Sequence, residues 1–362
     1  IDEAMESAWS CFPPFRKQPG KARAMFLRDI ARRLEENKDQ LVLLADTETS
    51  LGHIRLQLEL KRTISELELF ADLAKSEKWK ERKKEPSEPN RKPIPKPAMQ
   101  TTNLPLGPVV VIGACNFPFA ISVVGTDTAS ALAVGCPVVV KAHPEHARTC
   151  QFLADLVEQS LKETGMPAKA FQLIHGKEHS ITRALVEHPR TACVAFTGSL
   201  EGGKALNKLA CQRTSPIPFH AEMGSLNPVF VLPHALEDNG EDLAKAFVAA
   251  VNLFSGQMCT KPGLLLLIEG PGVEPFLGWT RDAVSKTKNS RMLNQTVFKN
   301  FNSITRDLAS SLNLVAGKKN DPNENERSAF CQIFEIKGRD FLKSYNLRTE
   351  AFGPASIIVR CQ

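Results

Sequence analysis

The sequence lacks the patterns that define zinc, membrane and secreted proteins. Its nine cysteines include no Cys-x-x-Cys pair, and its eight histidines include no His-Glu-x-x-His motif, so the usual zinc-ligand spacing is absent. No run of about 18 apolar residues occurs, and the amino terminus shows neither a secretory nor a transit pattern. We therefore expect a cytoplasmic protein with reduced thiols, no metal site and no membrane association.

The charge pattern argues against nucleic acid as a partner, and the length allows one large domain or two. The net charge is +6, and 46 basic residues are scattered among 40 acidic ones, without the clustered basic and aromatic face typical of nucleic-acid-binding proteins. A chain of 362 residues with 42% hydrophobic content can bury one large domain or two. The chain starts at Ile1 and stops at Gln362, just after the apolar run 356–359. We expect both ends to be cut.

Two kinds of pattern divide the first hundred residues. From Arg23 to Lys75, apolar residues recur at helical spacing, which predicts a set of amphipathic helices. From Lys75 to Pro97, five prolines and the charged run Glu-Arg-Lys-Lys-Glu rule out helix and favour an extended, solvated stretch.

After Pro105, strands alternate with helices, which predicts a parallel sheet with crossover helices. The expected strands are 109–112, 137–141, 171–174 and 193–196, and the expected helices are 126–134, 150–164, one ending at 185, and 201–209. Such a doubly wound sheet binds ligands at the carboxyl ends of its strands. A later block predicts a second α/β domain, with strands at 229–232 and 264–268 and helices at 242–253 and 298–312.

One cysteine differs from the others in its surroundings. Cys259 lies between a predicted helix and a predicted strand, in Gly256-Gln257-Met258-Cys259-Thr260, where a thiol can be exposed. A free thiol has a pKa of about 8.5, so a nucleophile at neutral pH needs a positive or dipolar environment. On this pattern, Cys259 is either a plain loop cysteine or a nucleophile.

Two polar residues follow apolar stretches and have two readings each. Glu222 ends Phe219-His220-Ala221 and precedes Met223-Gly224, so it is either a solvated turn residue or a general base. Asn116 sits past the end of a strand and two residues before Pro118. Its amide can donate to an oxyanion, although Asn is also common in such turns for backbone reasons.

The predicted edge of the first sheet offers two further candidates. Phe196-Thr197-Gly198-Ser199 is a strand, a tight turn and a helix start, with Ser199 as the expected N-cap. This turn is either a plain cap or a phosphate site, and it is not a G-x-G-x-x-G motif. Lys141 ends a buried strand, where a lysine is either a snorkelling terminus or a ligand for ribose or phosphate oxygens.

In their order along the chain, these segments resemble the aldehyde dehydrogenase superfamily. The matching segments span essentially the whole chain: Pro105-Leu106-Gly107-Pro108, Asn116-Phe117-Pro118, 135–141, 196–199, Glu222-Met223-Gly224, 256–259 and Glu350-Ala351-Phe352-Gly353-Pro354. The resemblance implies an α/β, aldehyde dehydrogenase-like fold. Its cofactor domain covers 1–85 and 105–223, an extended bridging and oligomerisation segment covers 86–104, and a catalytic domain covers 224–362, truncated at its C-terminal end.

The resemblance also implies a role for each candidate residue. Cys259 attacks the aldehyde, Asn116 and the Cys259 backbone N–H hold the oxyanion, and Glu222 activates the water that hydrolyses the thioester. Lys141 and Glu350 bind the cofactor riboses, the Gly198–Ser199 turn faces the pyrophosphate, and Phe352 belongs to the same cofactor site. The partner is a small-molecule aldehyde, and the expected assembly is a homodimer or homotetramer.

Within the family, the sequences around Lys141, Glu222 and Cys259 are most similar to 2,5-dioxopentanoate (2-oxoglutarate semialdehyde) dehydrogenases. Fatty and medium-chain aldehyde dehydrogenases share part of this pattern and form the alternative. Many NAD-using members have an acid three residues after the lysine, where this chain has Pro144. We therefore expect NADP to be accepted at least as well as NAD.

Besides Pro144, the end of the chain departs from the family pattern, because family members continue well past Glu350–Pro354. This leaves a catalytically silent cofactor-binding subunit as another alternative. An enzyme that passes the thioester to coenzyme A is disfavoured, because Glu222 is present to activate water.

Overall fold

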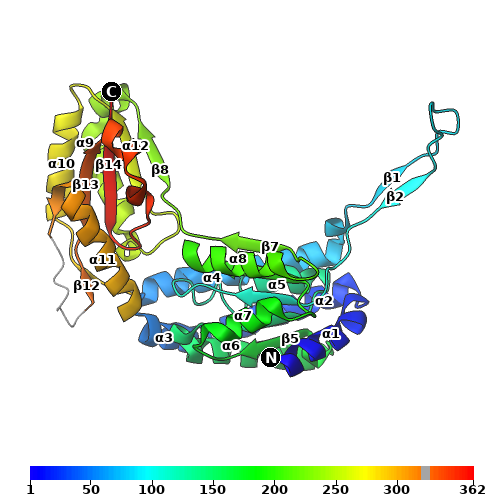
Figure 1. The fold of residues 1–362 in the computed structure, drawn as a ribbon. Coiled ribbons are helices and arrows are strands. Elements are labelled where there is room, and N and C mark those ends of the chain that lie inside the picture. The colour runs from blue at the N-terminus through cyan, green and yellow to red at the C-terminus, as the bar shows by residue number, and fades with distance from the viewer. Residues whose placement is uncertain (319–326) are drawn as a thin grey trace. The chain divides into compact units, whose positions relative to one another are not determined.

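The computed structural model describes residues 1–318 and 327–362, and this part of the chain divides into two compact units. Unit 1 consists of Ile1–Glu48 and Gly52–Met223, and unit 2 consists of Gly224–Gln362 with Thr49–Leu51. Figure 1 shows both as α/β structures, each built around its own sheet. The chain enters and leaves unit 2 briefly at Thr49–Leu51 and passes to it again between Met223 and Gly224.

The sheet of unit 1 is parallel throughout, in the order β5-β4-β3-β6-β7. Its strands are β3 (Val109–Ile112), β4 (Val138–Lys141), β5 (Phe171–Ile174), β6 (Cys193–Thr197) and β7 (Phe219–Glu222). The first four confirm the predicted strands to within one residue. All residues of β3 and β4 are buried, as expected for strands with helices on both faces.

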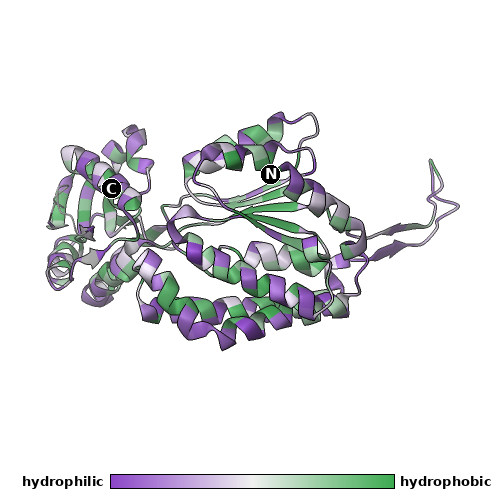
Figure 2. Cartoon of the chain, turned by 90° about the horizontal axis from the view of Figure 1, so that it is seen from below, coloured by the Kyte–Doolittle hydropathy of each residue, from purple (hydrophilic) through white to green (hydrophobic). Residues whose placement is uncertain are grey.

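Helices cover both faces of this sheet (Figure 2). The helices of unit 1 are α1 (Asp2–Arg16), α2 (Gly20–Glu36), α3 (Lys38–Thr49), α4 (His53–Ser76), α5 (Thr126–Val134), α6 (Ala147–Glu163), α7 (His179–Glu187) and α8 (Leu200–Gln212). One face packs against α1, α7 and α8 through a shared apolar cluster that includes Met5, Leu185 and Ala210. Helix α2 contacts α4, α5 and α6, and α4 also contacts α5. The sequence did not predict α1, which contains Pro13 and Pro14.

A two-stranded antiparallel hairpin, β1 (Lys83–Glu85) with β2 (Met99–Thr101), extends unit 1 (Figure 1). Every residue of the two strands is exposed. The predicted extended character is therefore correct from Lys83 onward. The short 3-10 helix η1 (Lys78–Lys80) lies earlier in the stretch where proline and charge predicted no helix.

The sheet of unit 2 has the order β11-β13-β14-β9-β8. Its strands are β8 (Pro228–Val231), β9 (Leu264–Ile268), β11 (Asn313–Gly317), β13 (Gln332–Lys337) and β14 (Ala355–Cys361). All pairings are parallel except β11 with β13. Strands β8 and β9 confirm predicted strands, whereas β11 and β13 were not predicted. A separate pair joins β10 (Ser290–Arg291) to β12 (Ser328–Ala329).

Helices α9 (Pro233–Asn252), α10 (Val273–Ser285), α11 (Gln295–Ser311) and α12 (Gly338–Lys343) complete unit 2, with 3-10 helices η4 (Leu253–Gly256) and η5 (Tyr345–Arg348). The predicted helix 242–253 is only the second part of α9, because Asn239 kinks the helix. Apolar clusters form two cores, one with α9 and α10 and one with α11. Within residues 1–318 and 327–362, no helix is both long and apolar enough to cross a membrane.

Candidate functional site

The register of the first sheet places three predicted site segments at one edge. Lys141 is the last residue of β4 and pairs with Ile112, the last residue of β3. Glu222 is the last residue of β7 and pairs with Thr197, which ends β6. Because parallel strands end at the same edge, Lys141, the turn after β6 and Glu222 share the carboxyl edge of the sheet, where doubly wound sheets bind ligands.

Lys141 is buried at this edge, with 8% of its surface exposed. Burial lowers the pKa of its ammonium from the usual value, and the nearby Cys150 thiol partly opposes this shift. A buried cation at the end of a strand has a desolvation cost that an anionic or hydroxyl-bearing ligand would reduce.

The turn after β6 is held by hydrogen bonds at both of its ends. Gly198 N donates to Glu222 O at 3.0 Å, and Gly202 N donates to Ser199 Oγ at 3.2 Å. Ser199 is therefore the N-cap of α8, as predicted. A Cβ at Gly203 would lie 2.4 Å from Met223 Sδ, so α8 packs closely on the Met223 side chain that follows β7.

Asn116 lies in the loop 113–125, between β3 and α5, and is 6% exposed. Its carbonyl oxygen accepts a hydrogen bond from Arg55 Nη2. Further along the loop, Phe119 N and Ala120 N both donate to Glu59 Oε1, at 2.7 and 3.0 Å. The loop is thus tied to α4, about 60 residues earlier in the sequence.

Cys259 lies in a turn of unit 2 between η4 and β9, as the sequence predicted, and its side chain is partly exposed. Its carbonyl oxygen accepts hydrogen bonds from Ser225 Oγ and Asn227 Nδ2, both at 2.6 Å. Asn227 Nδ2 also lies 2.9 Å from Lys261 O. The segment that follows Glu222 in the sequence therefore holds the backbone on both sides of Thr260.

The chain just before Cys259 has an unusual backbone. Phe254, Ser255 and Gly256 all have positive φ, at 50°, 59° and 64°. For residues other than glycine, this conformation costs on the order of 1 kcal/mol or more and persists only where the surroundings enforce it. A Cβ at Gly256 would lie 2.3 Å from the Gly353 carbonyl, so this turn packs directly against the Glu350–Pro354 segment.

Glu350 lies at this contact and is partly buried. Burial raises the pKa of its carboxyl group, while the positive charge of Lys261 and a hydrogen bond from the Ser225 backbone lower it. Gly224 also packs here, because a Cβ at Gly224 would lie 2.6 Å from Glu350 Oε2. Phe352 is partly buried two residues further on, beside Gly353, whose Cα packs on the Phe301 ring.

Lys261 connects the Cys259 turn to the Glu350 segment, and the sequence did not single it out. Its side chain is 3% exposed, and its Nζ donates to Ala351 O at 2.9 Å and to Ala355 O at 2.7 Å. Burial lowers the pKa of this amine to about 8, with the Glu350 charge opposing the shift. A lysine two residues after a candidate nucleophile was the available sequence signal, but it does not reveal burial.

Lys261 should make stability depend on pH. Between about pH 7 and pH 9.5 the folded state loses the Lys261 proton while the unfolded state keeps it, so stability rises with pH by about 2 kcal/mol from this group. Lys261→Met removes that contribution and the two hydrogen bonds. We expect its destabilisation relative to wild type, measured by urea unfolding, to be larger at the higher pH.

Lys343→Met, which removes an exposed lysine of α12, is the control and should show no such trend. A Lys261→Met destabilisation that stays constant or shrinks as the pH rises would contradict the assigned protonation behaviour.

The structure thus assembles two groups of predicted residues, one in each unit. Lys141, Gly198, Ser199 and Glu222 share the edge of the first sheet, with Asn116 in the loop after β3. In unit 2, Ser225 and Lys261 connect Cys259 to the Glu350 segment. That the two groups form one catalytic site stays a prediction.

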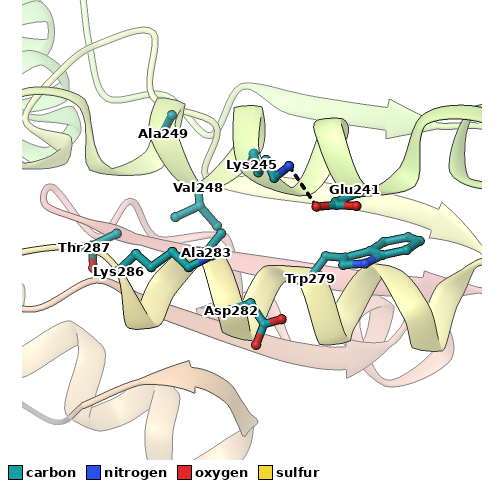
Figure 3. A pocket seen from close by; sticks show the side chains of 9 residues that line it. All are labelled: Glu241, Lys245, Val248, Ala249, Trp279, Asp282, Ala283, Lys286 and Thr287. Atoms are coloured by element: carbon teal, nitrogen blue, oxygen red, sulfur yellow. Dashed lines mark ion pairs between the residues drawn. The ribbon is translucent and has the colours of Figure 1, made fainter.

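A separate hollow lies between α9 and α10 and has a volume of about 310 Å³ (Figure 3). The Trp279 ring forms one end of it, and Glu241 and Lys245 form an ion pair of 2.8 Å along its upper side. None of the predicted site residues lines it. Among the residues that the structure describes, no group of three His, Cys, Asp or Glu side chains is arranged to hold a metal ion.

Comparison with known proteins assigns the class. The family model described as "Aldehyde dehydrogenase family" matches residues 1–362. A solved structure, an NAD-dependent benzaldehyde dehydrogenase from Corynebacterium glutamicum, has a TM-score of 0.81 at 20% identity and covers 99% of this chain and 75% of its own. The chain therefore belongs to the aldehyde dehydrogenase family, which uses NAD or NADP. The predicted family and fold are confirmed.

Two relatives are more similar in sequence to this chain than that solved structure is. Alpha-ketoglutaric semialdehyde dehydrogenase 2 from Azospirillum brasilense is 40% identical over 365 residues, covering 100% of this chain and 69% of the relative. Alpha-ketoglutaric semialdehyde dehydrogenase from Acinetobacter baylyi is 37% identical over 361 residues, covering 99% of this chain and 68% of the relative.

Proposed function

We propose that this chain oxidises 2,5-dioxopentanoate, which is alpha-ketoglutaric semialdehyde, to 2-oxoglutarate. The observation that carries the proposal is that two relatives at 40% and 37% identity, matched over essentially the whole chain, bear the name of this activity. The aldehyde dehydrogenase activity belongs to the family, and the choice of aldehyde is the proposed step.

The reaction needs a nucleophile, an oxyanion donor and a base, and we assign these roles to Cys259, Asn116 and Glu222. The Cys259 thiolate adds to the aldehyde carbon, and the Asn116 amide and Cys259 N–H donate to the resulting oxyanion. Oxidation of this adduct leaves a thioester. Glu222 takes a proton from water, which attacks the thioester, releases the Cys259 sulfur and yields the acid. Only Met223 and Gly224 separate Glu222 from Ser225, whose hydroxyl bonds the Cys259 carbonyl.

The residues present fit a nicotinamide dinucleotide, which supplies the hydride acceptor when bound. The N-terminus of α8, a helix of 13 residues capped by Ser199, suits the pyrophosphate. Lys141 is a buried cation at the same edge of the sheet, suited to ribose or phosphate oxygens. Glu350 is a partly buried carboxylate that can accept hydrogen bonds from ribose hydroxyls, and Phe352 belongs to the same proposed site.

We assign cofactor binding to residues 1–85 and 105–223 and catalysis to residues 224–362. Residues 86–104 are the proposed bridging segment of a homodimer or homotetramer. The exposed β1–β2 hairpin supports this role, because its strand edges are available for pairing. A cytoplasmic location fits the nine free cysteines.

NADP should be used at least as well as NAD. Pro144, in the short 3-10 helix after β4, carries no charge that would repel a 2′-phosphate. We expect Pro144→Glu to lower kcat/KM for NADP by roughly tenfold or more, and that for NAD by less than about threefold. Pro144→Gln is the uncharged control for the change of backbone. Strict use of NAD by the wild-type protein would refute this prediction.

The substrate is tested by comparing kcat/KM across aldehydes, with NADPH formation as the signal. The panel contains 2,5-dioxopentanoate, succinate semialdehyde and straight-chain alkanals. We expect 2,5-dioxopentanoate to exceed the alkanals by at least roughly a hundredfold, because a site built for a carboxylate leaves polar groups unpaired with an alkanal. An alkanal that matches or exceeds it would favour the fatty aldehyde alternative instead.

A further inference from the structure

The loop that carries Asn116 is irregular and yet buried. Residues 113–125 form neither helix nor strand, but Phe119, Ala120 and Val123 have no exposed surface. Backbone N–H and C=O groups that are buried need hydrogen-bond partners, and neither a helix nor a sheet supplies them here. The loop supplies some of these partners itself, since Ala114 N donates to Ile121 O and Ile121 N donates to Phe117 O, and side chains from elsewhere in the fold supply others.

Two charged side chains of α4 are among these partners. Arg55 and Glu59 are 3% and 5% exposed, and they lie one helical turn apart on the buried face of α4. Arg55 Nη2 donates to the Asn116 carbonyl, and Glu59 Oε1 accepts from Phe119 N and Ala120 N. The two side chains thus hold the backbone at Asn116 and again three and four residues later.

Arg55 also contacts the residue between these points. Its guanidinium carbon lies 4.9 Å from the centre of the Phe117 ring, a distance at which a cation and an aromatic face attract each other. Phe117 follows Asn116 directly, so Arg55 fixes the backbone on the carboxyl side of Asn116 through both contacts.

The energetic cost of burying Arg55 and Glu59 indicates that these side chains do more than fill the core. Burying an arginine and a glutamate is costly, and apolar side chains of similar volume would cover the same helix face without that cost. Apolar side chains, however, could not bond the loop backbone. The beginning of the loop is held separately, because His146 Nε2 lies 3.4 Å from Ala114 O. Loss of Arg55 would therefore loosen the part around Asn116 and leave that contact in place.

We propose that Arg55 and Glu59 are positioning residues that fix the Asn116 amide where it stabilises the oxyanion, an inference that rests on the proposed function of Asn116. Displacement of a donor by even about 1 Å can cost a large factor in rate. The two residues touch neither substrate nor cofactor in this role and act only through the Asn116 loop.

The test is a double-mutant cycle that measures the first-turnover rate of NADPH formation. We expect Asn116→Ala to lower this rate about a hundredfold and Arg55→Met to lower it about tenfold. In the Asn116→Ala background, Arg55→Met should change the rate by less than about twofold, because its effect acts through the missing amide. Cofactor Kd should stay within about twofold of wild type in both single variants.

Four further variants keep the test decisive. Arg62→Met removes an exposed arginine of α4 and should behave as wild type. Arg55→Lys retains a donor and should recover part of the rate. Glu59→Gln keeps an acceptor of almost the same shape and should keep most of the rate. Glu59→Leu removes the acceptor, and its own cycle with Asn116→Ala replaces the first if Arg55→Met does not fold.

The outcomes separate the inference from the function on which it rests. Rate losses that multiply in the double variants, or folded Arg55→Met and Glu59→Leu proteins with the wild-type rate, would overturn the positioning role. An Asn116→Ala protein with the wild-type rate would instead overturn the assignment of Asn116 to the oxyanion.

Discussion

Cys259→Ala is expected to lower kcat for aldehyde oxidation by a factor on the order of 10⁴ or more, because it removes the only atom assigned to form the thioester. The turn itself should survive. Its hydrogen bonds use the Cys259 carbonyl, which Ser225 and Asn227 contact, and not the sulfur. We therefore expect the variant to fold, to keep its cofactor Kd and to form no NADPH burst.

The matched control is Cys211→Ala, which removes the exposed thiol of α8. This variant should retain activity, and iodoacetamide should inactivate it as fast as it inactivates wild type. Equal labelling rates for Cys259 and Cys211 in the native protein, together with an active Cys259→Ala, would support the reading of Cys259 as a plain loop cysteine.

Glu222→Gln should separate the two halves of the reaction. The amide cannot take a proton from water, so thioester hydrolysis should slow by roughly 10²- to 10⁴-fold. Oxidation of the aldehyde needs no such base, so rapid mixing should still give a burst of about one NADPH for each active site. Mass spectrometry of the stalled protein should then find the acyl group on Cys259.

Glu222 is exposed in unit 1, and its backbone carbonyl, not its carboxylate, accepts the bond from Gly198. The substitution therefore leaves the local structure intact. Glu158→Gln, which changes an exposed glutamate of α6, should keep full turnover. If Glu222→Gln loses the burst as well, the carboxylate acts before the thioester forms, and its assignment to hydrolysis is wrong.

The elements that could be predicted are those whose sequence pattern is complete within a few residues. The buried run Val109–Ile112 and the run Leu264–Ile268 are apolar enough to predict β3 and β9 with the correct bounds. Short strands that are stabilised mainly by pairing with neighbouring strands were not predicted. Strand β11, for example, is largely exposed and is held by antiparallel pairing with β13.

Helix α1 escaped for a different reason. Proline usually interrupts a helix, and Pro13 and Pro14 lie inside this one. The helix is stabilised by burial instead, since Met5, Ala8 and Phe15 have no exposed surface. Tertiary packing thus overrides a local signal that argues against helix.

In the candidate site, too, the features that depend on neighbouring residues could be predicted, and those that depend on distant partners could not. Ser199 and the turn around Cys259 could be predicted, because capping and turn chemistry are local. The partners of Lys261 and Arg55 lie 90 and 61 residues away in the sequence. A charged residue at an apolar helical position, such as Arg55 in α4, was a visible signal, but its target could only come from the fold.

The reactivity of the cysteine thiols can be used to follow the unfolding of this protein. Five of the nine cysteines are buried: Cys11, Cys136, Cys150, Cys193 and Cys331. Burial raises the pKa of each of these five thiols, to about 12 for Cys331, so few of them are present as the thiolates that alkylating reagents attack. Counting reacted sulfurs during denaturation would therefore report how much of each unit has opened, with the native protein giving the low starting value.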